Sequence, residues 1–196
     1  MTKVRNFVEI TLNLPFSEFN FYELYRETFE KSELGRMKKL LPLREMAESF
    51  GLLRKSMTPK RGRKSYFTPE GKVALMFLKM KTQMSFPKLM EELNGNIHYQ
   101  LFCDILIDPT HPLTNYKLLD DIAAELAGSL KIQELARVRA TAMEGSFGTQ
   151  KEHYSLRRVK ARKKETEILY IFFGIHTANV VLLAERLMKQ QLAEAA

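Results

Sequence analysis

The residues whose types and spacing are best suited to chemistry lie in one segment, RATAMEGSFGTQKEHYSLRRVKARKK at residues 139–164. Glu144 is a carboxylate in this segment, and Lys151 follows it about two helical turns later. Glu144 is either a catalytic carboxylate directed at nucleic acid or a solvated glutamate on a helix face, paired with Lys151 or a neighbour. Periodicity alone favours the solvated glutamate, so the rest of the chain has to decide between them.

A second chemical feature of the chain is its excess of basic residues, which gives a net charge of +8 and a pI near 9.5. Such an excess favours an anionic partner, most often nucleic acid. The charge is concentrated in residues 54–64 and 157–164, each with six basic and no acidic residues. These runs either contact DNA phosphates or form a solvated loop and a solvated helix end. The predicted DNA-binding residues are Arg54, Lys55, Lys60, Arg61, Arg63, Lys64, Arg157, Arg158, Lys160, Arg162, Lys163 and Lys164.

The other groups that can bind a metal or act as a nucleophile are few. The four aspartates, Asp104, Asp108, Asp120 and Asp121, fall in one short window, and none lies on a strand pattern. Asp120 and Asp121 are neighbours on a predicted helix, where adjacent side chains point about 100° apart. The histidines show no metal-ligand spacing, and Cys103 lies in an apolar run, so we expect a buried structural thiol.

Apolar periodicity predicts short helices joined by tight turns over most of residues 33–135. Thr-Pro-Glu at residues 68–70 supplies a capping hydroxyl, a first-turn proline and an acid, which together predict a helix start. The helix that follows is apolar on several faces through residues 74–80, so we expect it to be central. A helical pattern continues through HYQLFCDILI at residues 98–107, and Thr114 is predicted to cap the next helix.

Outside these helices the patterns are more varied. Residues 8–12 alternate like a short strand, residues 108–113 form a loop, and residues 136–153 have helical spacing. The apolar run at residues 168–184 is interrupted by polar residues and falls short of the roughly 20 residues that a bilayer requires, so a buried helix is expected. The N-terminal sequence MTKVRNFVEI lacks an uninterrupted apolar stretch and predicts no signal peptide.

Two long blocks of the chain resemble one family of proteins. FTPEGKVALMFLKMKTQMSFPKLMEELNGNIHYQLFCDI resembles the helical N-terminal region of bacterial insertion-sequence transposases of the DDE type. MEGSFGTQKEHYSLRRVKARKKETEILYIFFGIHTANVV resembles the C-terminal end of the same enzymes. By this resemblance Glu144 is the third acid of an Asp-Asp-Glu site that binds Mg²⁺, and Lys151 is the lysine that follows it. The family's upstream arginine commonly stands four residues before the glutamate, where this chain has Ala140.

The resemblance also reveals a gap in the catalytic part. Two-metal sites that cleave phosphodiesters hold two ions about 3.5–4 Å apart and need several converging carboxylates. SLKIQEL at residues 129–135 resembles the end of the family's N-terminal part, and ARVRATAMEG at residues 136–145 resembles its last catalytic segment. Between Leu130 and Met143 there is no room for the strands and two aspartates of the family. We therefore expect an internal deletion that leaves this copy catalytically inactive alone.

The sequence predicts a mainly α fold in three parts. These parts are an N-terminal segment (1–32), a helical, helix-turn-helix-like domain (33–135), and a fragment of an RNase H-like α/β catalytic domain (136–196). The resemblance implies DNA transposition with Mg²⁺ as the family's cofactor, and it implies double-stranded DNA, such as terminal inverted repeats, as the partner. Self-association or association with a full-length transposase is also expected, in the bacterial cytoplasm and without a membrane. The alternatives are a non-catalytic DNA-binding regulator of transposition and a non-functional relic.

Overall fold

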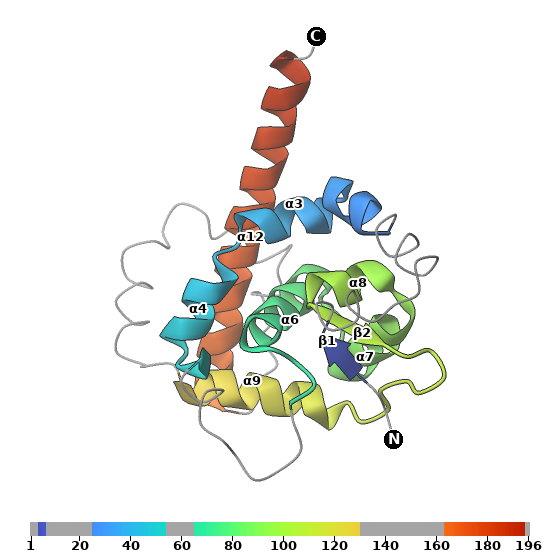
Figure 1. The fold of residues 1–196 in the computed structure, drawn as a ribbon. Helices are drawn as coiled ribbons and strands as arrows, with labels where there is room; N and C mark the ends of the chain where they lie inside the picture. Colours follow the sequence, from blue (N-terminus) through green and yellow to red (C-terminus); the bar gives the residue numbers. More distant parts are fainter. Residues whose placement is uncertain (1–3, 7–24, 54–64, 130–162, 195–196) are drawn as a thin grey trace. The chain divides into compact units, whose positions relative to one another are not determined.

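The computed structural model describes residues 4–6, 25–53, 65–129 and 163–194, which are mainly helical (Figure 1). The mainly α prediction is therefore confirmed, whereas the helix-turn-helix and RNase H-like assignments stay predictions. The chain divides into two compact units, Met1–Leu75 with Phe86–Tyr116 and Met76–Ser85 with Lys117–Ala196. The predicted strand at residues 8–12, loop at 54–64 and helix at 136–153 lie outside the described residues. The predicted three-part domain division also stays a prediction.

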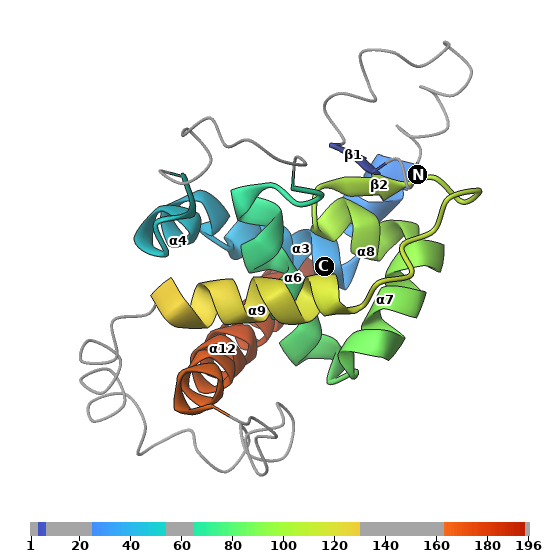
Figure 2. The same ribbon diagram turned by 90° about the horizontal axis from the view of Figure 1, so that it is seen from below.

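The first unit contains helices and one pair of short strands. Its described elements are β1 (Val4–Asn6), a helix over residues 25–31, α3 (Glu33–Leu40), α4 (Leu43–Ser49), the first part of α6 (Pro69–Thr82), α7 (Phe86–Gly95), α8 (Ile97–Phe102) and β2 (Ile105–Ile107). The two strands are antiparallel, with Val4 opposite Ile107 and Asn6 opposite Ile105 (Figure 2). In this way the strand after α8 joins the N-terminal residues to the helices.

Helix α6 begins where the sequence predicts, because Thr68 accepts a hydrogen bond from the Gly71 backbone N–H at 2.9 Å. Its central residues, Val73 to Leu78, are all fully buried, which confirms the expected central position. A Cβ at Gly71 would lie 2.5 Å from the carbonyl oxygen of Cys103. Glycine is therefore required for the first turn of α6 to pack against the backbone that follows α8.

The predicted helical pattern at residues 98–107 is wrong in its second half. Helix α8 ends at Phe102, and Asp104 has a positive φ of 54°, a left-handed conformation that ends a helix. Ile105–Ile107 then forms β2, for which β-branched isoleucines are well suited and which gains hydrogen bonds from β1. A strand partner about one hundred residues away in sequence overrides the local apolar period. Cys103 is fully buried, as expected, and burial raises the pKa of its thiol.

The predicted cap at Thr114 is also wrong, because helix α9 (Lys117–Ser129) begins three residues later. The preceding loop is held by Asn94, whose side-chain amide forms two hydrogen bonds with the Leu113 backbone. Asn94 Nδ2 donates to the Leu113 carbonyl at 2.8 Å, and the Leu113 N–H donates to Asn94 Oδ1 at 2.9 Å. This pair holds Leu113 in the loop, and the helix begins after Tyr116.

The described helices of the second unit are the end of α6, α9 and α12 (Lys164–Glu194). Helices α9 and α12 pack against each other, and Phe77 meets Phe173 edge-to-face with ring centroids 5.0 Å apart. The predicted helix at 168–184 is confirmed but is longer than expected, and it buries one face while Leu182, Leu183 and Leu187 are exposed. By length and composition, α12 is apolar enough to cross a membrane, a test that core helices of globular proteins also pass.

Candidate nucleic-acid interface

Most residues of the predicted site lie outside the described part of the chain. Glu144 and Lys151 are among them, as are the predicted DNA-binding residues except Lys163 and Lys164. These two lysines are exposed at the start of α12, where the backbone carbonyl of Lys163 accepts a hydrogen bond from the Glu167 N–H at 3.1 Å. The N-terminal end of a helix carries partial positive charge, so it gives no stabilisation to lysines there.

The sequence predicts that the four aspartates do not form a metal site, and in the structure they have different hydrogen-bond partners and exposures. Asp104 Oδ1 accepts a hydrogen bond from Lys38 Nζ at 2.6 Å. Asp108 accepts hydrogen bonds from the backbone and side chain of Thr110 and contacts His111, and these bonds lower its pKa to about 2. Asp120 and Asp121 are exposed neighbours on α9.

Within the described residues, no three His, Cys, Asp or Glu side chains gather as a metal site would require. These carboxylates therefore do not fit the converging set that Mg²⁺ needs. The magnesium expectation rests on Glu144 alone.

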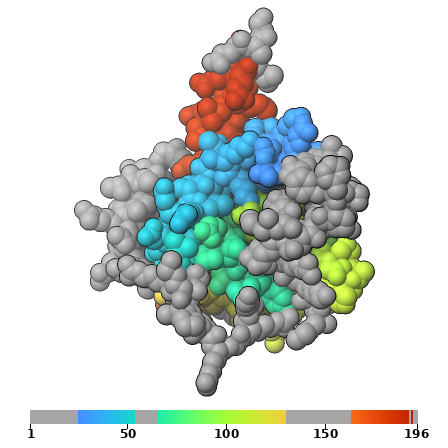
Figure 3. Space-filling model, in the orientation of Figure 1, coloured from blue at the N-terminus to red at the C-terminus, as the bar shows by residue number. Residues whose placement is uncertain are grey.

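A charged pocket in the first unit brings together residues that the sequence did not single out. It is built where the helix over residues 25–31 meets α3, and both helices reach the face of the molecule shown in Figure 3. Ser32 separates the two helices, because its hydroxyl donates to the Phe29 carbonyl at 2.6 Å and accepts the Gly35 N–H at 3.1 Å. A Cβ at Gly35 would lie 2.0 Å from the Phe29 carbonyl oxygen, so only glycine permits this close crossing.

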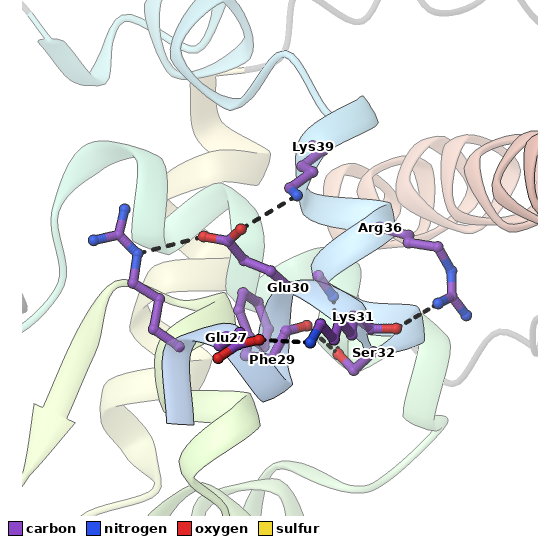
Figure 4. Close-up of polar contacts among 9 residues, drawn as sticks. Glu27, Phe29, Glu30, Lys31, Ser32, Arg36 and Lys39 are labelled. Atoms are coloured by element: carbon purple, nitrogen blue, oxygen red, sulfur yellow. Dashed lines mark hydrogen bonds and ion pairs between the residues drawn. The ribbon is translucent and has the colours of Figure 1, made fainter. Parts of the chain in front are cut away.

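The pocket has a volume of about 320 Å³ and an aromatic wall with charged side chains around it. Its lining residues are Arg26, Phe29, Glu30, Gly35, Lys38, Lys39, Leu101 and Asp104. The Glu30 carboxylate lies 3.4 Å from Arg26 Nε and 3.4 Å from Lys39 Nζ (Figure 4). One carboxylate therefore bridges two cations on different helices.

Lys38 has a different role from the other two cations of the pocket. Its Nζ donates to the Leu101 carbonyl and to Asp104 Oδ1, both at 2.6 Å, and lies 5.9 Å from the centre of the Phe29 ring. Its side chain is only 20% exposed. Lys38 thus ties α3 to the C-terminal end of α8, where carbonyl groups carry partial negative charge.

The sequence did not predict this pocket, because its charged residues do not form a run of one sign. In residues 25–39 three acids, Glu27, Glu30 and Glu33, are interspersed among five basic residues, so no run of one charge appears there. The signals that were present are a capping Ser32 followed three residues later by Gly35, and acids and bases four residues apart. Their meaning depends on the crossing of two helices, which a single sequence does not reveal.

The second unit contains another partly buried cation, Lys79. Its Nζ donates to the Met84 carbonyl and lies 6.0 Å from the centre of the Tyr170 ring. Burial lowers the pKa of Lys79, and the nearby negative charge of Asp120 opposes this shift. Burial, with Asp120, raises the pKa of Tyr170 to about 12. These groups join the end of α6 to α9 and α12, so we interpret them as packing contacts of the unit.

Comparison with known proteins identifies a family. Residues 22–121, just over half of the chain, match the family model described as Transposase domain (DUF772). The matched residues include the charged pocket, α3 to α8, β2 and the start of α9. No curated protein and no solved structure matches the chain.

Proposed function

The chain belongs to the family of the Transposase domain (DUF772), and from this premise we propose that it binds the DNA ends of an insertion sequence. The observation that carries this proposal is the match over residues 22–121. The net charge of +8 supports an anionic partner. Residues 54–64 and 157–164 supply the concentrated basic charge that phosphate contacts require.

We further propose that the intact relatives are DDE enzymes and that this copy is internally deleted. Glu144 then occupies the position of the third acid, and Lys151 that of the lysine after it. The small number of residues between Leu130 and Met143 supports the deletion. Strand transfer needs several carboxylates around Mg²⁺, so we expect no catalysis by this copy alone.

The experiment that tests DNA binding is a fluorescence-anisotropy titration of the full chain. The probes are duplexes from the two ends of the element that encodes the protein, and the control is a shuffled duplex of equal length and composition. We expect tighter binding to the element ends and an affinity that falls steeply as salt rises. Equal affinity for both duplexes would remove the specific part of the proposal, and no binding would remove all of it.

The deletion has a separate test. Incubation of the protein with labelled element ends and Mg²⁺ should give neither nicked nor joined products. A product of either kind would overturn the proposed inactivity. An intact sister copy with additional residues between Leu135 and Arg139 would establish the deletion independently.

A second candidate function is regulation of transposition without catalysis. It is favoured by one observation, since the family-matched residues lie mostly in the first unit, which has its own buried residues. A protein of this kind competes with full-length transposase for element ends in the bacterial cytoplasm, bound to the nucleoid. Added in excess, it should inhibit cleavage by the full-length enzyme. Unchanged cleavage would exclude this role and leave the relic as the alternative.

A further inference from the structure

The three cations of the charged pocket are held with different strength. Lys38 donates two short hydrogen bonds, to the Leu101 carbonyl and to Asp104. Arg26 and Lys39 meet Glu30 at 3.4 Å, longer than the roughly 2.7–2.9 Å of a strong charge-assisted bond. Their side chains are 51% and 63% exposed, so water screens both ion pairs. The two ion pairs that Glu30 forms are therefore weak.

The position of Glu30 is the position that another anion would take. An anion between Arg26 and Lys39 gains two cationic partners from two helices at once. A phosphodiester has two unesterified oxygens, so it can meet both cations at short distance, whereas the tethered carboxylate lies 3.4 Å from each. Phe29 and Gly35 also line the pocket.

We propose that the pocket formed by Arg26, Glu30 and Lys39 is a binding site for one backbone phosphate of DNA, and that Glu30 competes with this phosphate. Its residues are outside the basic runs at 54–64 and 157–164 in the sequence. It lies within the residues that match the transposase domain, and it rests on the DNA binding proposed above. When DNA binds, Glu30 leaves the two cations and turns to water, and Lys38 keeps α3 in place on α8.

The molecule supplies a matched control for this competition. Glu27 and Lys31 form an ion pair of 2.6 Å on the same helix, four residues apart, and neither residue lines the pocket (Figure 4). Glu27→Gln and Glu30→Gln each remove one negative charge from residues 25–31. A general electrostatic effect raises DNA affinity equally in both variants, whereas competition in the pocket raises it mainly in Glu30→Gln.

The test measures the affinity of full-length variants for the element-end duplex at several salt concentrations. Glu30→Gln should bind about fivefold more tightly than wild type. A surface ion pair contributes about 1 kcal/mol, which corresponds to about a fivefold change in the dissociation constant. Glu27→Gln should change the affinity by less than about twofold. Arg26→Gln with Lys39→Gln should weaken binding and make its salt dependence shallower, because fewer counterions are released. Lys31→Gln should alter the salt dependence less.

Two results would overturn the inference, and they are distinguishable. If wild type binds DNA but Glu30→Gln and Glu27→Gln have equal effects, the pocket is not a phosphate site and the proposed DNA binding stands. If wild type binds no DNA, the proposed function and the pocket fail together. Thermal unfolding followed by circular dichroism should show native helix content in every variant, since the substituted side chains lie at the surface.

Discussion

The segment from Asn94 to Leu113 and helix α12 are held in different ways. In the segment, side-chain amides bind backbone groups, as when Gln100 bridges Leu93 and Ile107 and Asn94 binds Leu113. Helix α12 instead packs a stripe of apolar residues against its unit and also carries three exposed leucines. Directional hydrogen bonds specify one conformation. An apolar helix face that is only partly buried by its neighbours leaves apolar surface for other contacts.

The largest effect is expected where apolar packing holds α12. Phe173 is fully buried and meets Phe77 edge-to-face, so Phe173→Ala should lower the free energy of unfolding by about 3–5 kcal/mol. Leu183→Ala, in the same helix but 46% exposed, should change it by less than about 0.5 kcal/mol. Urea unfolding of both full-length variants measures the difference. Similar losses in both would mean that the exposed face of α12 is covered in solution.

The next largest effect is expected from a substitution that removes hydrogen bonds in the segment from Asn94 to Leu113. Gln100 is 4% exposed, donates to the Leu93 carbonyl at 2.9 Å and accepts the Ile107 N–H at 3.0 Å. Gln100→Leu removes these partners from buried backbone groups and should lower the free energy of unfolding by about 1–3 kcal/mol. Gln190→Leu on the exposed end of α12 is the control and should be nearly neutral. If Gln100→Leu is also neutral, these bonds do not determine the stability of the segment.

The same contrast explains what the sequence alone could predict. Helix α6 has a local start signal at Thr68 and an apolar period, and α7 has a stripe that includes Leu89 and Leu93, so both are visible in sequence. The change from helix to strand after Asp104 is not visible, because β2 depends on a distant partner. The Asn94 bridge to Leu113, in the loop before α9, is not visible either, because it joins residues of two different segments.

For the candidate site, the sequence predicted the transposase family but not the charged pocket. The transposase resemblance was recovered from long blocks of residues, and the family match confirms it at the level of a transposase domain. The charged pocket was not recovered, because Glu30 and Lys39 come together only when Ser32 breaks the helix and Gly35 permits the crossing. Charge density along a chain does not reveal which charges share a pocket.

The third prediction concerns self-association of the protein through α12, and the substitutions involved should leave the free energy of unfolding nearly unchanged. Leu182, Leu183 and Leu187 are 44%, 46% and 39% exposed, so α12 offers an apolar surface to a second copy. We expect wild type to self-associate as its concentration rises, and replacement of all three leucines by Gln to make it monomeric. Sedimentation velocity measures this change. Tyr116→Gln, which alters another exposed large apolar residue, is the control and should leave association unchanged.

The smallest effect is a pH dependence in the loop that ends the hydrogen-bonded segment. The side-chain hydrogen bond from Thr110, with further bonds from its backbone and from His111, lowers the pKa of Asp108 from 3.8 to about 2. The folded chain therefore holds the Asp108 carboxylate ionised at a pH where the unfolded chain is already protonated. This contribution to stability is fully present above about pH 4 and is lost as the pH falls through about 2.

Asp108→Asn removes this titration and tests it directly. The difference in unfolding free energy between wild type and the variant should be constant above about pH 4 and should shrink as the pH falls toward about 2. The effect is small because the side chain is partly exposed and water screens its partners. Unfolding curves at matched ionic strength across this range measure it. Parallel curves would show that the loop bonds do not favour the ionised carboxylate, and the contrast with α12 would then rest on the buried amides alone.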